Sequence, residues 1–170
     1  MTRVIAYVGL GSNLLHPRRQ LARALVRLAR IPRTRIVAIS RNFESAPIGA
    51  PAPQPDYINA VALLSTSLSP RALLARLLAI ERRQGRRRVL GMRPNAARPL
   101  DLDLLLYGRV RVHVPSLVLP HPRMHERAFV LRPLVDVAPT TTIPGHGLAR
   151  RLVRNVRGQR AAVTRAHAIH

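Results

Sequence analysis

A pair of aspartates begins an alternating run of leucines in the second half of the chain. From Leu100 to Leu106 the even-numbered positions are all leucine, and Asp101 and Asp103 occupy the first two odd positions. Successive side chains of a strand point to opposite faces, so the pattern predicts leucines on one face and both carboxylates on the other. Carboxylates on Cα atoms roughly 6 to 7 Å apart repel each other unless positive charge lies between them. We therefore predict that Asp101 and Asp103 hold magnesium; ion pairs with arginines on a solvated face are the alternative.

The segment before this strand, from Gly85 to Pro99, is rich in arginine and irregular. Its glycines and prolines predict a long loop, and such loops in compact domains are commonly functional. Arg86, Arg88, Arg93 and Arg98 lie in this loop, where they would fold over the carboxylates and neutralise a polyphosphate. For each of them a solvated surface position is the alternative. The chain contains no lysine, which excludes a GxxxxGK[ST] phosphate loop.

The composition limits the class of protein. With 170 residues the chain is long enough for one core, and we expect a single domain over 1–170. No apolar run approaches the roughly 18 residues of a membrane span and no signal peptide is recognisable, so we expect a cytoplasmic protein without membrane contact. The absence of cysteine excludes disulfides and thiolate metal sites.

The net charge of +22 raises the possibility of a nucleic-acid partner. All 29 basic residues are arginine, a uniformity that biased codon usage explains more simply than a groove for phosphates. RNA-binding surfaces also interleave aromatic rings, whereas this chain has three Tyr, two Phe and no Trp. We interpret the charge as a solvated surface and expect no specific nucleic acid; a basic module that binds RNA or DNA is the competing hypothesis.

Hydrophobic periodicity and turn residues predict the order strand, helix, strand, strand, helix, strand. We expect strands over 3–10, 35–45, 57–67 and 100–107, a helix from 17 to before Pro32, and a helix that starts at 70 after a Ser69 cap. Residues 110–114 are expected to return as a hairpin partner of the last strand, 127–137 to form a further helix, and about 146–170 to be a basic tail without assigned structure. The βαββαβ order indicates an α+β, ferredoxin-like sandwich, in which helices pack on one face of an antiparallel sheet.

Five segments in succession resemble the motifs of the 6-hydroxymethyl-7,8-dihydropterin pyrophosphokinase family. They are Gly11–Leu14, Gln54–Ala60, Glu81 with Gly85-Arg86, Arg98–Asp103, and Pro120–Pro122 with the following Arg127–Phe129. They occur in the family's order with nearly its spacing and cover about residues 4–145; the most specific part is RPLDLD followed by LPHP. The resemblance implies a ferredoxin-like fold, in agreement with the element order. It also implies a small kinase that transfers pyrophosphate from ATP to the pterin alcohol and releases AMP, in folate biosynthesis.

The resemblance implies a role for individual residues on the nucleotide side. Asp101 and Asp103 match aspartates that hold two magnesium ions, and Arg86 and Arg98 match arginines that contact the phosphates during catalysis. The other matches on the ATP side are Glu81, Arg88, His121 and Arg127. We note that Glu81 interrupts the apolar stripe of its helix, as a carboxylate beside an active centre would. The Gly11-Ser12-Asn13 segment is expected to be a structural turn under the sheet edge, with direct contact to the ligand as the alternative.

For the pterin, the resemblance implies two aromatic rings and a polar edge. Tyr57 and Phe129 match rings that sandwich the pterin, with a place in the core as the alternative for both. The groups that read the pterin edge match Asn59 and the backbone around Ser45, Pro47 and Ile48. Asn59 as a satisfied polar strand residue and His121 as a turn histidine are likewise open alternatives from the residues alone.

The chain departs from the family pattern in two places. The loop from Gly85 to Arg98 is longer than the common form and lacks its tryptophan, which weakens the match of Arg88. Leu78, one helical turn before Glu81, stands where relatives often have glutamine, so we expect weaker ATP binding. The metal and pterin residues are in place, and we expect an active, monomeric enzyme; a related transferase with another acceptor alcohol is a further alternative.

Overall fold

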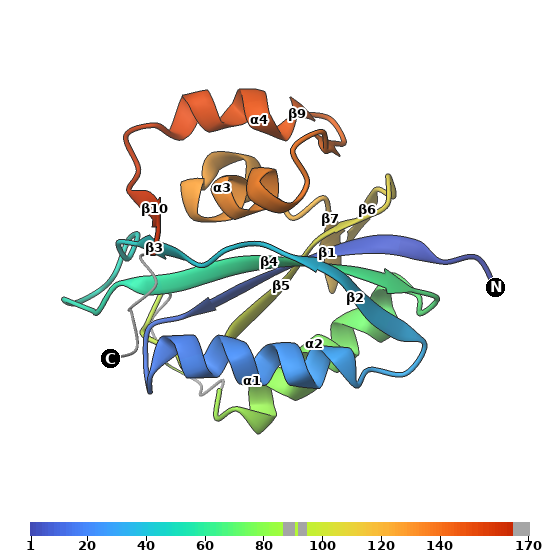
Figure 1. The fold of residues 1–170 in the computed structure, drawn as a ribbon, viewed down its shortest axis with the longest axis horizontal. Coiled ribbons are helices and arrows are strands. Elements are labelled where there is room, and N and C mark those ends of the chain that lie inside the picture. The colour runs from blue at the N-terminus through green and yellow to red at the C-terminus, as the bar shows by residue number, and fades with distance from the viewer. Residues whose placement is uncertain (87–90, 92–94, 165–170) are drawn as a thin grey trace, which may run out of the picture.

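The computed structural model describes residues 1–86, 91 and 95–164, which form a layered α/β arrangement around one antiparallel sheet (Figure 1). The strands of the main sheet are β1 (Val4–Ser12), β2 (Thr34–Ile39), β3 (Phe43–Ser45), β4 (Tyr57–Thr66), β5 (Asp101–Tyr107) and β10 (Ala161–Val163). The helices are α1 (Pro17–Ala29), α2 (Pro70–Arg83), α3 (Ala128–Val137) and α4 (Ala149–Leu152), with 3₁₀ turns at Met124–Glu126 and Val153–Val156. Two small hairpins complete it, β6 (Val112–Val114) with β7 (Leu117–Leu119) and β8 (Thr142–Ile143) with β9 (Gly147–Leu148).

The main sheet has the order β10-β3-β4-β1-β5, and β2 also pairs with β4. All of its pairings are antiparallel. Its centre is β4, whose buried apolar residues pair along their whole length with β1. The βαββαβ order predicted from the sequence is confirmed over β1 to β5, with the second strand divided into β2 and β3. The break falls at Ser40, whose backbone and hydroxyl stay bonded to Val61 while Arg41 turns outward to Asp136.

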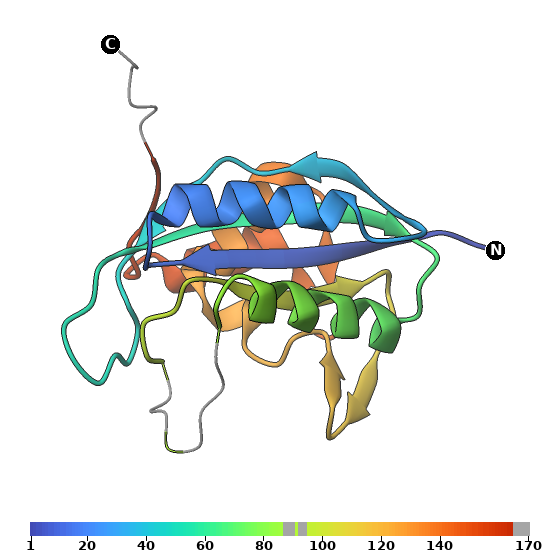
Figure 2. The ribbon, with the colours of Figure 1, turned by 90° about the horizontal axis from the view of Figure 1, so that it is seen from below.

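Helices cover both faces of the sheet, not one as we predicted. Figures 1 and 2 show α1 and α2 across one face, where Leu21, Leu28, Leu73 and Leu77 pack on β1, β4 and β5. On the opposite face, α3 and α4 enclose a second core around Leu131 and Leu134. The strands supply buried apolar side chains to both cores, and a sheet that is apolar on both faces needs cover on both.

A bulge in β5 changes the predicted alternation. Leu104 pairs with Val8 and Leu106 pairs with Tyr7, so Leu105 is an extra residue of β5 that has no pairing partner on β1. Leu102 and Leu104 therefore face α1 and α2 as expected, but Leu105 and Leu106 both enter the core under α3. The prediction that Leu106 shares the face of the other even-numbered leucines is wrong.

Two further expectations differ from the structure. Residues 112–114 pair with β7 and not with β5, because the turn at Gly108, at φ 54°, directs the chain away from the sheet. The segment after 146, to which we assigned no structure, forms β9, α4, a 3₁₀ turn and β10 in its described part, and residues 165–170 lie outside the described residues. Apolar side chains such as Ala149, Val156 and Ala161 are buried there among its arginines. In the described part of the chain, none of the helices has the length and apolar character to cross a membrane.

Candidate active site

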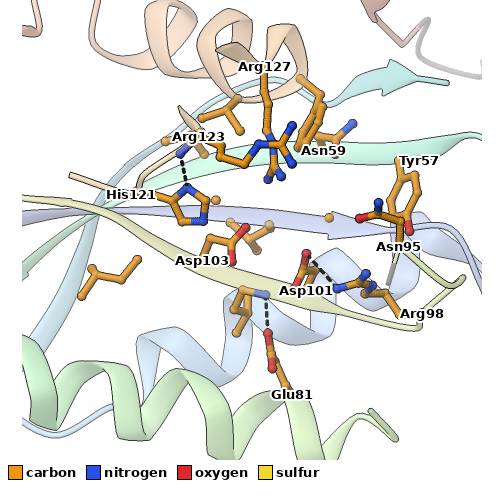
Figure 3. Close-up of a pocket in the computed structure, with 18 of the residues that line it drawn as sticks. Tyr57, Asn59, Glu81, Asn95, Arg98, Asp101, Asp103, His121, Arg123 and Arg127 are labelled. Carbon is orange, nitrogen blue, oxygen red and sulfur yellow. Dashed lines mark hydrogen bonds and ion pairs between the residues drawn. The ribbon is translucent and has the colours of Figure 1, made fainter. Parts of the chain in front are cut away.

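A cavity of about 470 Å³ lies beside β5, between α2, the N-terminus of α3 and the loops that follow β3 and α2 (Figure 3). Nearly all of the site residues predicted from the sequence line it, although they come from eight separate segments. They are Ser45, Pro47, Ile48, Tyr57, Asn59, Glu81, Arg86, Arg98, Asp101, Asp103, His121, Arg127 and Phe129. The remaining predicted residue, Arg88, lies outside the described residues, as does Arg93.

The carboxylates of Asp101 and Asp103 project from the same face of β5 into this cavity (Figure 3). Strand alternation puts them there, because Leu100, Leu102 and Leu104 are buried on the other face. Burial, followed by the charges of Asp101 and Glu81, raises the pKa of Asp103 to about 7. Such concentrated negative charge in a half-enclosed site is suited to binding a cation.

Two arginines, Arg86 and Arg98, contact the carboxylate of Asp101. Arg86 Nη1 donates to Glu81 Oε1 at 2.6 Å and to Asp101 Oδ1 at 2.5 Å. Glu81 is 2% exposed and also accepts the backbone N–H of Leu102 at 2.8 Å, so this carboxylate fixes both the arginine and the strand. Arg98 approaches from the other side, with Nη1 3.5 Å from Asp101 Oδ2. The two guanidinium groups thus border one end of the carboxylate pair.

His121 and Arg127 border the other end of the site. Burial and the neighbouring Arg127 lower the pKa of His121 to about 4, which keeps the imidazole neutral at physiological pH. Its Nδ1 accepts the backbone N–H of Arg123 at 3.3 Å, so in the neutral ring the proton is on Nε2. Burial also lowers the pKa of Arg127, whose guanidinium carbon lies 5.5 Å from the centre of the Phe129 ring. A hydrogen-bond donor, His121 Nε2, and a cation, the Arg127 guanidinium, therefore line the same cavity.

The end of the cavity formed by β3 and β4 is aromatic and polar. Tyr57 and Phe129 are only partly buried and line the cavity, whereas Phe43 and Tyr107 are core residues. Asn59 is 3% exposed, and its amide nitrogen donates to Ser45 Oγ at 2.8 Å and to Phe43 O at 3.3 Å. Its carbonyl oxygen lies 3.3 Å from where a Cβ of Gly11 would be, so glycine at 11 leaves this oxygen uncovered. The arrangement matches a flat ligand with hydrogen-bonding groups at its edge.

Asn13 joins the loops that frame the cavity, a connection that its sequence position does not reveal. Its side-chain nitrogen donates to Gln54 Oε1 at 2.9 Å and to Pro55 O at 3.2 Å, and its oxygen accepts the backbone N–H of Arg98 at 3.0 Å. Gln54 continues the connection by donating to Asn95 O at 2.8 Å. We predicted a structural turn at Gly11-Ser12-Asn13, but Gly11 and Ser12 are the last residues of β1, and Gly11 lines the cavity. The partners of Asn13, 41 to 85 residues away, can be found only in the structure.

Comparisons with known proteins identify the family. Residues 7–139 match the family model described as 7,8-dihydro-6-hydroxymethylpterin-pyrophosphokinase (HPPK). The chain is 50% identical over 138 residues to 2-amino-4-hydroxy-6-hydroxymethyldihydropteridine pyrophosphokinase of Pseudomonas aeruginosa, which covers 81% of this chain and 83% of the relative. The enzyme of the same name from Haemophilus influenzae is 42% identical over 151 residues, which is 89% of this chain and 92% of that one.

The fold is also found among solved structures. A crystal structure of an HPPK-DHPS in complex with substrates superposes with a TM-score of 0.73 and 12% identity, over 91% of this chain. The alignment covers 43% of that longer chain. This likeness supports the α+β architecture, and the sequence relatives decide the family. The chain belongs to the 7,8-dihydro-6-hydroxymethylpterin-pyrophosphokinase family.

Proposed function

We propose that this chain binds ATP and 6-hydroxymethyl-7,8-dihydropterin side by side in the cavity next to β5, and transfers the pyrophosphoryl group to the pterin alcohol. The pyrophosphokinase activity and its place in folate biosynthesis follow from the family. The observation that carries the residue assignment is the meeting of Asp101 and Asp103 with Arg86, Arg98 and Arg127 in one cavity. A site for a nucleoside triphosphate needs carboxylates that hold the metal ion and arginines that contact the phosphates.

The two aspartates fit the magnesium that this chemistry requires. Among the described residues, no group of three or more His, Cys, Asp and Glu side chains is arranged as a complete metal site. Magnesium does not need one, because it is commonly held by one or two carboxylates together with substrate phosphates and water. Burial, followed by repulsion from Asp101 and Glu81, raises the pKa of Asp103, and a cation between Asp101 and Asp103 would relieve that repulsion. Two ions, once bound there with ATP, would neutralise the phosphates and polarise the bond that breaks.

The pterin is assigned to the aromatic end of the cavity. Tyr57 and Phe129 line the cavity, as do the apolar residues Pro47 and Ile48. Because both donors of the Asn59 amide are already bonded to Ser45 and Phe43, its oxygen is fixed as an acceptor for an N–H group of the ligand. A flat ring with donors along one edge satisfies this acceptor and fills the space between the two rings.

The reaction joins the hydroxymethyl oxygen of the pterin to the β-phosphorus of ATP, while the bond from that phosphorus to the oxygen bridging it to the α-phosphate breaks. AMP leaves with the bridging oxygen, and the hydroxyl proton passes to solvent or to the phosphates. Arg86 and Arg98 are placed beside Asp101 to stabilise negative charge on the transferring group. At the end of the cavity opposite Arg86 and Arg98, neutral His121 would donate from Nε2 to a phosphate oxygen, and Arg127 would add positive charge. Catalysis then rests on alignment and charge neutralisation more than on a general base.

The departures from the family pattern affect the nucleotide side. Leu78 lines the cavity, so an apolar side chain occupies a position where the resemblance gave a polar one. We expect ATP to bind more weakly as a result. Arg88 is assigned to ATP by its sequence match.

Helices of the same chain cover both faces of the sheet, which supports a monomeric enzyme. The use of ATP as a substrate agrees with a place in the cytoplasm.

The proposal is tested by incubating the purified protein with Mg-ATP, with and without 6-hydroxymethyl-7,8-dihydropterin, and separating the nucleotides. We expect AMP and a pterin diphosphate in equal amounts, and only when the pterin is present. AMP with a different alcohol but not with the pterin would indicate another acceptor. Tight, salt-dependent binding to RNA together with no AMP would favour the nucleic-acid hypothesis.

A further inference from the structure

The C-terminal segment reaches the proposed pterin site through two consecutive residues, Gln159 and Arg160. This segment lies beyond residues 7–139, over which the family model matches. Neither residue lines the cavity. Each, however, bonds to the residue that directly precedes one of the two rings assigned to the pterin.

Gln159 holds the segment that carries Phe129. Its side-chain oxygen accepts the backbone N–H of Ala128 at 2.9 Å, and its nitrogen donates to the carbonyl of Glu126 at 2.8 Å. Arg127, at the N-cap of α3, makes no side-chain hydrogen bond to the helix, so Gln159 supplies a cap from a distant segment. The amide thereby ties together the two residues that flank Arg127.

Arg160 holds the segment that carries Tyr57. Its Nη2 donates to Asp56 Oδ2 at 2.6 Å, and its Nη1 lies 3.6 Å from Glu44 Oε1. The backbone continues the connection in register, because Ala161 pairs with Ser45, and Ser45 pairs with Tyr57 on β4. The strand β10 is thus the edge strand of the main sheet, and it pairs with β3, which lines the proposed pterin pocket through Ser45.

We propose that Gln159 and Arg160 are positioning residues for the pterin, which fix the segments of Phe129 and Tyr57 relative to each other so that the rings stand ready for a flat ligand. The inference rests on the proposed function, since it takes these two rings as the pterin sandwich. Arg160 is about half exposed, and exposed ion pairs add little to stability. Its contribution should therefore appear in pterin binding and much less in folding.

The test compares Gln159→Glu, Gln159→Leu and Arg160→Gln in the full chain, with Arg157→Gln as control, because Arg157 is exposed nearby. Gln159→Glu keeps an acceptor for Ala128 but loses the donor to Glu126. KM for 6-hydroxymethyl-7,8-dihydropterin and for ATP, kcat and the thermal midpoint are measured for each. We expect the pterin KM to rise roughly three- to tenfold in all three variants, with the thermal midpoint nearly unchanged in Gln159→Glu and Arg160→Gln. The ATP KM should stay nearly unchanged in Arg160→Gln, whereas Gln159→Glu should also raise it modestly, because Gln159 holds the segment that carries Arg127. Arg160→Lys should restore part of the loss, and Arg157→Gln should match the unsubstituted protein.

Two results would overturn the inference while leaving the proposed function intact. One is an unchanged pterin KM in Gln159→Glu and Arg160→Gln; the other is a parallel change of both KM values with the thermal midpoint, as for a general loss of structure. If the unsubstituted protein itself makes no AMP with the pterin, the proposed function is contradicted instead.

Discussion

Arg86 donates from Nη1 to Oδ1 of Asp101 at 2.5 Å, across the gap between the end of α2 and the start of β5. The same nitrogen donates to Glu81, which in turn accepts the backbone N–H of Leu102. The guanidinium is therefore held by a helix on one side and a strand on the other. An arginine oriented in this way needs little reorganisation to meet a phosphate, and such preorganisation is a main source of electrostatic catalysis.

Arg86→Lys should lower kcat at least about thirtyfold while the protein stays folded, because a lysine ammonium cannot reproduce the planar, forked geometry of the guanidinium. The matched control is Arg82→Lys, since Arg82 is on the exposed side of α2. Steady-state AMP formation and far-UV circular dichroism check both points. Equal rates for the two variants would show that Arg86 has no special part in the reaction.

Asp103→Asn should abolish activity and, without metal, stabilise the fold at high pH. Because the pKa of Asp103 rises from 3.8 to about 7 on folding, the folded protein binds a proton that the unfolded chain releases between these values. Stability is therefore lost as pH rises toward and through 7. We expect Asp103→Asn to exceed the unsubstituted protein by on the order of 2 kcal/mol at pH 8, with allowance for partial solvent screening, and by little at pH 4.

Urea denaturation in EDTA at the two pH values measures this difference. A variant that is less stable than the unsubstituted protein at pH 8 would contradict the account in which burial, together with repulsion from the neighbouring carboxylates, disfavours the charged form of Asp103.

His121 should make stability depend on pH in the opposite direction. Its pKa falls from 6.5 to about 4 on folding, so between these values the unfolded chain binds a proton that the folded protein does not. Stability is lost as pH falls through this range. His121→Asn removes the effect, and we expect the variant to gain about 1 kcal/mol relative to the unsubstituted protein between pH 7.5 and pH 5. Parallel stability curves for the two proteins over that range would show that the histidine titrates normally.

Asn13→Asp tests the connection between the loops with almost no change of shape. The carboxylate cannot donate to Gln54 or Pro55, although it still accepts from Arg98. Asn13 is 2% exposed, so the substitution places a carboxylate at a buried position and removes two part-buried hydrogen bonds, and the free energy of unfolding should fall by about 2 kcal/mol. We also expect a lower kcat, because Arg98 shares the network. Chemical denaturation and steady-state rates are the measurements, and unchanged values in both would refute the connection.

The part of the site that was readable from the sequence is the part set by local periodicity. Alternation in β5 placed Asp101 and Asp103 on one face, and the polar interruption at Glu81 marked the helix that faces them. The bulge that moves Leu106 to the other core depends on pairing with Tyr7 and leaves no local signal. Asn13 with Gln54, and Gln159 with Ala128, are contacts between distant segments, which neither propensity nor spacing encodes. The arginine-rich composition after residue 146 hid the structure of this segment from the sequence analysis. A few buried apolar side chains, such as Ala149, Val156 and Ala161, pack it against the rest of the fold as far as β10.

The most direct test of the central claim follows the label of ATP through the reaction. Transfer from ATP labelled at the β-phosphate should put all of the transferred label into the pterin product, whereas label at the α-phosphate should remain in AMP. The same reaction with Asp103→Asn should give neither product at a measurable rate. Transfer of the γ-phosphate alone, with ADP as the labelled product, would contradict attack at the β-phosphorus and with it the proposed use of this site.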